Sequence, residues 1–405
     1  MKAGWRESTL AEVCQFVNRG VSPKYVESGG IAVLNQKCIR DHEVSFQLCR
    51  RHDIAAKAVL ADRLVRLGDV LVNSTGTGTL GRVAQMRLYV PEPTTVDSHV
   101  TIVRAADGIF VPAFFGYALI AIEHEIQGGG EGCGGQTELS RAKLANGFRI
   151  CFPIEHAEQK RIVAILDQAF EAIATAQNNA DRAAADVIEL FDSALRSSFE
   201  TRSETWRTEP LQTLVDKDCS LSYGIVQPGE LVENGLPIVR PTDLTRKEVS
   251  VSGLKRIAPS LAQSYQRTKL RGNDLLLCVR GSTGVVSVAC KELKDANVTR
   301  GIVPINFDPA IISQTYGYYV LKSPQVQEQV RAKTYGAALM QINISDVRKL
   351  SVPFPNLLEQ GRIVEKLDAL HLESERLAVV YRKKQQAVRA LSKSLLDQAF
   401  SGQLV

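Results

Sequence analysis

Glu158-Gln159-Lys160-Arg161-Ile162-Val163 is repeated 201 positions later as Glu359-Gln360-Gly361-Arg362-Ile363-Val364. With the same spacing, Trp5-Arg6 recurs as Trp206-Arg207. Self-similarity at a fixed period is the sequence pattern of a repeated structural unit, and it has to be recognised before any fold is assigned. The 405 residues therefore consist of two copies of one unit of about 200 residues.

Each copy divides into a mixed α/β part and a helical part. Short apolar runs among Gly and Pro turns predict strands at residues 31–34, 70–72, 100–103, 275–279 and 302–305. Gly116-Tyr117 in the first copy matches Gly317-Tyr318 in the second. A proline, Pro153 or Pro355, marks the junction after which the last residues of each copy read as one long helix.

The two predicted helices carry apolar residues at alternating spacings of four and three, which is the pattern of a coiled-coil seam. In the first helix the positions are Ile162, Leu166, Ala169, Ile173, Ala176, Ala180, Ala183, Val187, Leu190 and Ala194; in the second they are Ile363, Leu367, Leu370, Ser374, Leu377, Tyr381, Lys384, Val388, Leu391 and Leu395. Small residues on one side face larger ones on the other, which favours pairing of the helices with each other. The alternative is two independent helices, each packed on its own domain.

Almost no linker separates the first helix from Trp206, so we expect an antiparallel pair, with the C-terminal residues near Trp5. The expected fold class is α+β: two α/β domains in a pseudo-two-fold arrangement, separated by two long antiparallel coiled-coil helices. The expected domains are residues 1–152 and 202–354, with helical segments at 153–201 and 355–405. Residues 202–356 hold 20 basic against 14 acidic residues, and residues 158–201 hold 4 against 8.

Several function classes are disfavoured by what the sequence lacks. None of the eight cysteines forms a Cys-x-x-Cys pair, so a structural zinc site is not expected. The longest apolar run, residues 111–122, is too short to span a bilayer, and the first residues show no apolar stretch of a signal peptide. A reduced cytoplasm is the expected location.

No catalytic motif is found. The chain has no Gly-x-x-x-x-Gly-Lys phosphate loop and no Asn/Asp-Pro-Pro-aromatic tetrapeptide of an adenine methyltransferase. Asp97-Ser98-His99 contains the residue types of a catalytic triad, but neighbours on a strand point to opposite faces. We therefore expect a chain that is not an enzyme and that holds no metal.

The informative segments are polar loops that occur at matching places in both copies. A glycine-rich stretch at 128–137 corresponds to residues 333–343, and the loops at 74–78 and 280–284 follow matching strands. Residues 19–25 and 222–229 form a third pair of loops. Gln and Asn can read adenine edges, Arg can read guanine, and Lys, Thr and backbone amides can hold phosphates. For each single arginine, the alternative is a solvated or salt-bridged side chain.

These loops, together with Arg240 and Arg300 as further candidates for guanine contacts, give the candidate DNA-binding residues. They are Arg19, Ser22, Lys24, Tyr25, Ser74, Thr75, Thr77, Gln136 and Thr137 in the first copy, and Tyr223, Gln227, Arg240, Arg280, Ser282, Thr283, Arg300, Lys333, Tyr335, Gln341 and Asn343 in the second.

The layout resembles the HsdS specificity subunits of type I restriction-modification enzymes. The resemblance rests on Tyr223-Gly224-Ile225-Val226-Gln227-Pro228-Gly229, on Gly235-Leu236-Pro237-Ile238-Val239-Arg240, on the Pro junctions followed by Glu-Gln-x-Arg-Ile-Val, and on Leu395-Leu396-Asp397-Gln398-Ala399-Phe400-Ser401-Gly402-Gln403-Leu404. It covers the whole chain, and its specificity lies in the arrangement of these motifs. The first copy departs from it, because it lacks the Tyr-Gly-Ile-Val-Gln-Pro loop and carries the long glycine-rich segment.

The resemblance implies a non-catalytic subunit of two target-recognition domains, which reads a bipartite double-stranded DNA target. Such subunits bind two methyltransferase subunits that carry S-adenosylmethionine, and two restriction subunits that use ATP and Mg can join them. This chain is then expected to hold no cofactor of its own. Three alternatives remain open: a specificity subunit of a methylation-only or other phage-defence complex, a self-sufficient DNA methyltransferase, and a purely structural tether.

Overall fold

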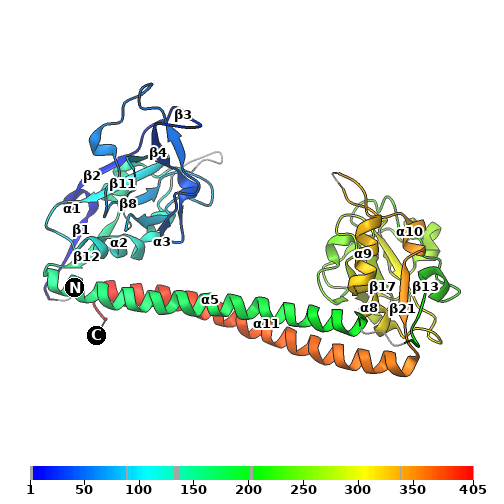
Figure 1. Cartoon of the computed structure of the whole chain (residues 1–405). Helices are drawn as coiled ribbons and strands as arrows, with labels where there is room; N and C mark the ends of the chain where they lie inside the picture. The colour runs from blue at the N-terminus through cyan, green and yellow to red at the C-terminus, as the bar shows by residue number, and fades with distance from the viewer. Residues whose placement is uncertain are drawn as a thin grey trace. The chain divides into compact units, whose positions relative to one another are not determined.

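Figure 1 shows the computed structural model of the chain, which describes residues 3–87, 90, 92–131, 137–200, 204–337 and 339–404. The chain divides into two compact units: Met1–Asp181 with Lys383–Val405, and Arg182–Arg382. Two long helices, α5 (His156–Glu200) and α11 (Leu357–Phe400), each contribute one part to each unit. Unit 1 and unit 2 below denote these two divisions.

Unit 1 is built on a four-stranded antiparallel sheet in the order β2-β11-β8-β9. A second sheet has the order β10-β4-β7-β3, with β10 and β4 parallel, and two-stranded sheets pair β1 with β12 and β5 with β6. The strands are β1 (Trp5–Thr9), β2 (Cys14–Arg19), β3 (Tyr25–Val26), β4 (Ile31–Leu34), β5 (Ile39–Arg40), β6 (Glu43–Val44), β7 (Arg50–His52), β8 (Val70–Asn73), β9 (Val83–Gln85), β10 (Thr94–Val96), β11 (Val100–Ala105) and β12 (Arg149–Pro153). The helices are α1 (Leu10–Val13), α2 (Pro112–Ala121), α3 (Glu123–Gly128) and α4 (Arg141–Asn146), with 3-10 turns at Gln36–Cys38 and Ala61–Arg63.

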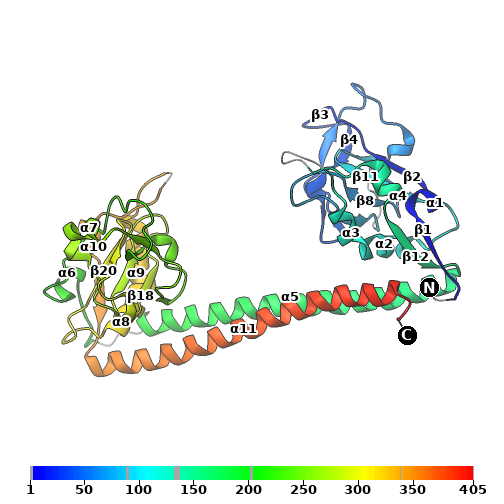
Figure 2. The same ribbon diagram turned by 180° about the vertical axis from the view of Figure 1, so that it is seen from behind.

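The two central strands of unit 1 are apolar on both faces, because both faces are covered. All four residues of β4 and all four of β8 are buried, as expected of strands between two layers. Pro112 begins α2 at a position where the missing N–H costs nothing, and α2 buries Phe114, Phe115 and Leu119. α1 and α4 pack against each other beside β12 (Figure 2).

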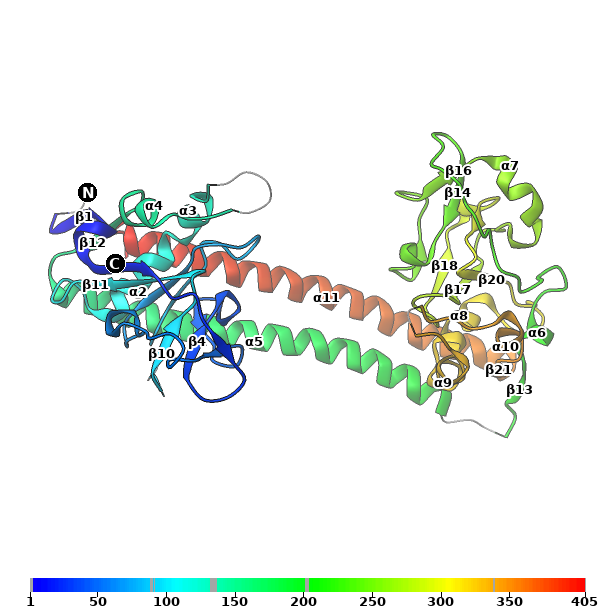
Figure 3. The same ribbon diagram turned by 90° about the horizontal axis from the view of Figure 1, so that it is seen from above.

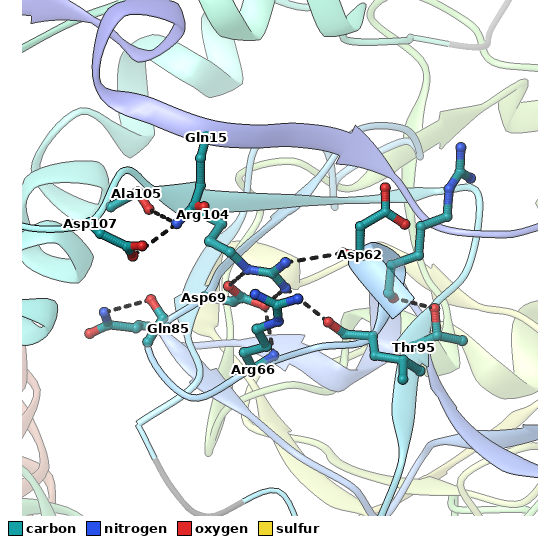
Figure 4. A network of polar contacts seen from close by, with 12 residues as sticks. Gln15, Asp62, Arg66, Asp69, Gln85, Thr95, Arg104, Ala105 and Asp107 are labelled. Carbon is teal, nitrogen blue, oxygen red and sulfur yellow. Dashed lines mark hydrogen bonds and ion pairs between the residues drawn. The ribbon is translucent and has the colours of Figure 1, made fainter. Parts of the chain in front are cut away.

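A buried ion pair ties the start of β8 to β11 (Figure 4). Arg104 donates two hydrogen bonds of 2.7 Å to the Asp69 carboxylate, and its guanidinium also donates to the carbonyls of Asp62 and Leu64. The backbone N–H of Arg66 supplies a further donor to Asp69. In unit 2, Asp274 takes the equivalent place and accepts from the Asn306 amide at 2.7 Å. A neutral partner therefore suffices in one copy.

Unit 2 repeats this plan. A four-stranded sheet has the order β15-β18-β17-β20, a three-stranded sheet the order β16-β14-β19, and β13 pairs with β21. The strands are β13 (Arg207–Pro210), β14 (Leu236–Val239), β15 (Glu248–Val249), β16 (Lys255–Ile257), β17 (Leu275–Cys278), β18 (Val286–Ala289), β19 (Asn297–Val298), β20 (Ile302–Ile305) and β21 (Ser351–Phe354). The helices are α6 (Leu211–Leu214), α7 (Pro259–Ala262), α8 (Gln314–Lys322), α9 (Pro324–Lys333) and α10 (Ile344–Arg348), with 3-10 turns at Pro241–Asp243, Gln263–Thr268 and Lys291–Leu293. Figure 3 shows α8 beside β17 and β18.

The repeated Glu-Gln-x-Arg-Ile-Val motif has a structural explanation in its glutamine. Gln159 is fully buried; its amide accepts from Val111 N–H at 2.7 Å and donates to the carbonyls of Ile109 and Pro153. Gln360 is equally buried and bonds Ser313 N–H, Ile311 and Pro355 in the same way. Each glutamine therefore fastens a long helix to the strand before it and to the helix, α2 or α8, that packs on it.

This contact corrects one detail of the repeat alignment. Val111 corresponds to Ser313, so the spacing on α2 and α8 is 202 rather than 201. Tyr117 and Tyr319 are then equivalent, and both donate to a helix aspartate: Tyr117 to Asp167, and Tyr319 to Asp368 at 2.6 Å. The match of Gly116-Tyr117 with Gly317-Tyr318 is wrong by one residue, because the chemical identity of two dipeptides does not fix which side chain faces the helix.

Within each unit, the parts of α5 and α11 pack antiparallel. In unit 1, Ile162 and Leu166 share a core with Leu396 and Ala399, and Asp181 accepts from Gln385 at 2.6 Å further along. In unit 2, the ring of Phe191 lies 5.4 Å from that of His371, and Leu195, Phe199 and Leu367 share one core. Leu404 joins the core that contains Trp5, and its carbonyl accepts from Arg161. The expected antiparallel pairing and the expected position of the C-terminal residues near Trp5 are confirmed.

The buried stripe of the long helices follows a slightly longer period than the heptad. Ile162 to Val187 and Ile363 to Tyr381 keep the expected positions, but Leu190 and Leu391 are 62% and 50% exposed and Lys384 is exposed. Phe191 and Leu195 are buried in place of Leu190. A straight helix turns every 3.6 residues, so a strict 3.5-residue pattern drifts by about 20° per heptad. The assignment of Leu190, Lys384 and Leu391 to the seam is wrong for this reason.

None of the helices formed by described residues combines the length and the apolar composition that crossing a membrane requires.

Candidate nucleic-acid interface

In unit 1, the loop after the central strand β8 is bound to a segment much later in the chain, here called the hairpin, whose described residues are Glu131 and 137–139. Thr75 forms an antiparallel bridge with Glu138, and the N–H of Leu139 donates to the Ser74 carbonyl at 2.8 Å. Glu131 and Glu138 exchange two backbone hydrogen bonds of 2.9 Å, which close the base of the hairpin. The loop at residues 74–78 and the hairpin therefore form one surface.

Unit 2 builds the same surface from different residues. Arg280 bridges Gln341, and Tyr335 and Gln341 exchange backbone hydrogen bonds of 2.9 and 2.8 Å. The N–H of Ile342 donates to the Val279 carbonyl, as Leu139 does to Ser74. The expectation that residues 333–343 occupy a place equivalent to the glycine-rich stretch is confirmed for its described residues.

A third loop in each unit lies close to a neighbouring strand through a glycine. A side chain at Gly20 would collide with the backbone of Val96, and one at Gly224 with the backbone of Val298. Beyond these glycines, Val21 and Ile225 form parallel bridges with Asp97 and Thr299. Only glycine permits this approach, so the two loops are equivalent although their sequences differ.

Arg19 and Tyr223 occupy equivalent positions just before these glycines. The Arg19 guanidinium donates to the Leu139 carbonyl at 2.9 Å, and the Tyr223 hydroxyl donates to the Ile342 carbonyl at 3.1 Å. Arg19 also pairs with Glu138 at 2.7 Å. Both side chains tie the third loop to the hairpin, and this gives the candidates Arg19 and Tyr223 a positioning role at the surface.

The remaining candidates of unit 1 fall into two groups. Ser22, Lys24, Tyr25, Thr77 and Thr137 are exposed, and the Arg50 guanidinium lies 3.3 Å from the centre of the Tyr25 ring. Burial raises the pKa of the Tyr25 hydroxyl, which remains a hydrogen-bond donor at neutral pH. Thr75 is half-buried and its hydroxyl is engaged by Gln36 and His99. Gln136 lies outside the described residues.

Ser74 is not available for DNA. Its side chain is fully buried, and its hydroxyl lies 2.5 Å from that of Thr101 on β11. Its counterpart in unit 2, Val279, is 1% exposed. The candidate Ser74 is therefore corrected to a buried residue directly after β8, whose backbone N–H donates to the His99 carbonyl at 2.8 Å.

In unit 2, Gln227, Ser282, Arg300, Tyr335 and Asn343 are exposed, and Thr283, Lys333 and Gln341 are half-buried. The Tyr335 hydroxyl donates to Asn343 Oδ1 at 2.6 Å, so these two form one polar pair on the hairpin. Lys333 Nζ lies 3.9 Å from Asp346 Oδ1, a distance that leaves the ammonium group free to bind another anion. The structure thus brings most of the unit 2 candidates together around one loop and one hairpin.

Arg240 and Arg280 differ in what holds them. Arg240 forms a two-pronged pair with Asp243, at 3.1 and 2.9 Å, and this hydrogen bonding raises its pKa. Arg280 Nε is buried and has no hydrogen-bond partner among the described residues. An unpaired buried donor is costly to the free protein, and this distinguishes Arg280 from Arg240, whose guanidinium is paired.

Two residues near the surface of unit 1 were missed by the sequence reasoning. His99 is exposed and its Nδ1 lies 2.8 Å from Thr75 Oγ1, next to the loop at 74–78. The Asp97 carboxylate accepts from the backbone N–H of His99, not from its imidazole, and burial raises the pKa of Asp97. Asp97, Ser98 and His99 therefore form no catalytic triad. Arg50, stacked on Tyr25, is the other. Their signal was a polar side chain at the end of a strand.

No group of three or more His, Cys, Asp or Glu side chains in the described part of the chain is arranged to hold a metal ion.

Comparison with known proteins points to one family. Residues 227–380 match the family model described as the type I restriction modification DNA specificity domain. The EcoBI specificity subunit of a type I restriction enzyme from Escherichia coli is 27% identical over 201 residues, which are 50% of this chain and 42% of that protein. The StySPI specificity subunit from Salmonella potsdam is 24% identical over 204 residues, which are 50% of this chain and 44% of that protein. Each match thus spans less than half of the relative's length.

Solved structures support the fold over the full chain. A chain from a study of complex assembly and conformational transition in a type I R-M system covers 100% of this chain and 99% of its own, with a TM-score of 0.76 and 20% identity. The HsdS subunit from Thermoanaerobacter tengcongensis covers 100% and 98%, with a TM-score of 0.57 and 20% identity. The expected fold class is confirmed, and the match of residues 227–380 to the specificity-domain model agrees with the resemblance inferred from the sequence.

Proposed function

We propose that this chain is a specificity subunit of a type I restriction-modification enzyme and reads a bipartite DNA target as the non-catalytic recognition subunit of the complex. Each unit would read one half-site. The observation that supports this proposal most directly is a surface that both units share. In each unit, the loop after the central strand is bridged to a distant hairpin, through Thr75 and Glu138 in unit 1 and through Arg280 and Gln341 in unit 2.

The chemistry of the two surfaces suits different half-sites. Unit 2 offers Arg280 and Gln341 side by side, and these residue types can bond guanine and adenine edges in the major groove. Unit 1 offers hydroxyls, the exposed imidazole of His99 and the stacked pair of Tyr25 and Arg50. Because the supporting backbone is the same and the side chains differ, the units are suited to read unlike sequences.

The partners follow from the family and are part of the proposal. Two methyltransferase subunits would bind this chain and carry S-adenosylmethionine, and two restriction subunits using ATP and Mg can complete the complex. This chain would supply recognition only. We therefore expect the purified chain to transfer no methyl group from labelled S-adenosylmethionine to DNA and to hydrolyse no ATP, unless the partner subunits are added.

A domain exchange tests the proposal. Residues 202–354 are replaced by the matching domain of a related subunit, and methylated bases are mapped in a genome that carries the complex. One half of the target should change and the other should remain. A change in both halves, or in neither, would contradict the assignment of one half-site to each unit.

A further inference from the structure

Unit 2 contains a cleft that the recognition surface described above does not include. It has a volume of about 580 Å³ and lies between the loop at 283–287, α8 and α11. Cationic side chains line it on two sides: Arg246 and Lys247 before β15, and Lys322 at the end of α8. Glu375 is the acidic residue among those that line it, and its carboxylate lies 3.5 Å from His371 Nε2.

Lys247 and Lys322 are held differently. Lys247 Nζ lies 2.7 Å from Asp368 Oδ1, so the positive charge of Lys247 is paired with a carboxylate on α11. Lys322 Nζ donates to the Tyr318 hydroxyl at 3.3 Å and lies near the rings of Tyr318 and Phe191. The carboxylate that acts electrostatically on Lys322 is that of Asp192 on α5.

An ammonium group in this position is costly for the free protein. Burial lowers the pKa of Lys322, because removal from water disfavours the charged form. The carboxylate of Asp192 acts in the opposite direction and raises this pKa, while the nearby cation Lys247 lowers it, and the net effect is a lowered pKa. A bound anion would offset the effects of burial and of Lys247, and the cleft is open enough to admit one.

Unit 1 shows that the fold does not require a cation at the position of Lys322. With the spacing of 202 on α2 and α8, the position of Lys322 corresponds to Ile120, which is 8% exposed. With the spacing of 201 on the long helices, His371 corresponds to Phe170, whose ring stacks on Tyr117 at 5.5 Å. The first copy has apolar side chains at these two positions, whereas Arg87, which donates to Tyr117 and Asp167, supplies the cation that corresponds to Lys247. Lys322 and His371 are therefore the groups of the cleft that are particular to unit 2.

The cleft shares a wall with the proposed recognition surface. Thr283 and Gly284 line it, and they belong to the loop that begins at Arg280. The Thr334 hydroxyl, at the base of the hairpin, lies 3.3 Å from that of Thr283. The cleft is therefore adjacent to both the loop and the hairpin of the proposed recognition surface.

From this arrangement we propose that the cleft binds a phosphate group of the DNA backbone beside the half-site read by unit 2, with Lys322 as its principal ligand and Arg246 and the Thr283 hydroxyl as further donors. Ammonium, guanidinium and hydroxyl groups are the usual protein ligands of DNA phosphates. The proposal rests on the proposed function. A contact of this kind positions the domain on the duplex and carries no sequence information.

The test uses the complex assembled with its methyltransferase partner. Equilibrium DNA binding is measured between about 50 and 200 mM salt for wild type, Lys322→Gln, Lys322→Arg and Lys291→Gln. Lys291 is an exposed lysine of the same unit outside the cleft, so its substitution removes an equal charge. Loss of one phosphate contact should reduce the slope of log affinity against log salt by about one.

We expect Lys322→Gln to show this loss of slope, to weaken cognate and unrelated DNA by the same factor, and to leave the methylated bases unchanged. Lys322→Arg should keep most of the slope, and Lys291→Gln all of it. The proposal is overturned if Lys322→Gln keeps the wild-type slope, if Lys322→Arg loses as much as Lys322→Gln, or if only cognate DNA is weakened. A wild-type complex without sequence preference would instead contradict the proposed function.

Discussion

Arg280 combines a fixed backbone with an unsatisfied side chain. Its backbone is bridged to Gln341, while its Nε is buried and lacks a partner among the described residues. A donor held in this state costs the free protein part of its stability and makes binding of an acceptor more favourable. A guanine edge offers two acceptors in the geometry that an arginine fork matches.

Arg280→Ala and Gln341→Ala should therefore weaken binding of the partnered complex to its cognate DNA. Loss of a good base contact costs about 1–3 kcal/mol, and discrimination at one base pair should relax. Affinity is measured on cognate DNA and on DNA altered at single positions, with Arg267→Ala as a control at an exposed arginine of unit 2. Unchanged cognate affinity in both variants would remove these residues from the interface.

The contacts of Asp368 with Lys247 and Tyr319 should make the stability of unit 2 depend on pH. Burial acts to raise the pKa of Asp368, but hydrogen bonds from Lys247 and Tyr319 outweigh it and hold the pKa below its ordinary value of 3.8. A depressed carboxyl pKa stabilises the fold above the unfolded value, and this contribution is lost as pH falls through the folded value. The contact should therefore be complete at neutral pH and weaken below about pH 4.

Asp368→Asn should lower the stability of unit 2 at neutral pH and flatten its loss on acidification. Hydrogen exchange of the backbone amides of α8 and α11, followed from neutral to acidic pH, reports this. Asp397→Asn, at an exposed aspartate of α11, is the matched control. Equal acid sensitivity of wild type and Asp368→Asn would mean that other carboxyl groups control the transition.

At the scale of elements, buried glutamines fasten the long helices. Gln360→Ala would leave Ser313 N–H and the carbonyls of Ile311 and Pro355 without their partner. Each unsatisfied buried group costs about 1–3 kcal/mol. Exchange of amides in residues 311–360 should accelerate at least about tenfold, which corresponds to 1.4 kcal/mol. Gln398→Ala, at an exposed site of the same helix, should change little.

In the Gln159→Ala variant, the accelerated hydrogen exchange of backbone amides should be confined to unit 1. Acceleration spread over both units by either substitution would contradict the separate role of each glutamine.

The elements could be predicted well because their signals are local. Residues 31–34 and 302–305 form β4 and β20 as expected, since a short apolar run between turns has few alternatives. The site was harder. Ser74 was misplaced because a strand end and a loop start look alike, and the shared role of Arg19 and Tyr223 was invisible because an arginine and a tyrosine satisfy the same carbonyl. Contacts over 120 residues leave no local pattern.

At the scale of the whole molecule, the proposed bipartite reading assigns to the paired helices the spacing between the two proposed half-sites. Removal of seven residues from each helix, at the facing levels of Asp181 and Gln385, should shorten the pair by roughly 10 Å at about 1.5 Å per residue. At about 3.4 Å per base pair the spacer should shrink by up to about three base pairs. The deletion also shifts the buried stripe by about 20° and turns one half-site, so binding should weaken.

Methylome sequencing of the double-deletion complex gives the spacer directly, and a deletion in one helix alone serves as an unpaired control. An active complex with its original spacer would show that the helices do not set the distance. Altered bases within either half-site would show that the helices take part in reading them.

Each unit is completed by helix from the other half of the sequence: unit 1 includes Lys383–Val405, and unit 2 includes Arg182–Glu200 of the first helix. A single copy of the repeat would leave Leu166 and Phe199 without the residues that cover them. Two identical copies could solve this by exchanging helix ends, as a domain-swapped dimer does. Gene duplication and fusion of such a dimer would then free the two halves to diverge. A half-length version of this protein should therefore dimerise, and under the proposed function such a symmetric dimer should bind a palindrome.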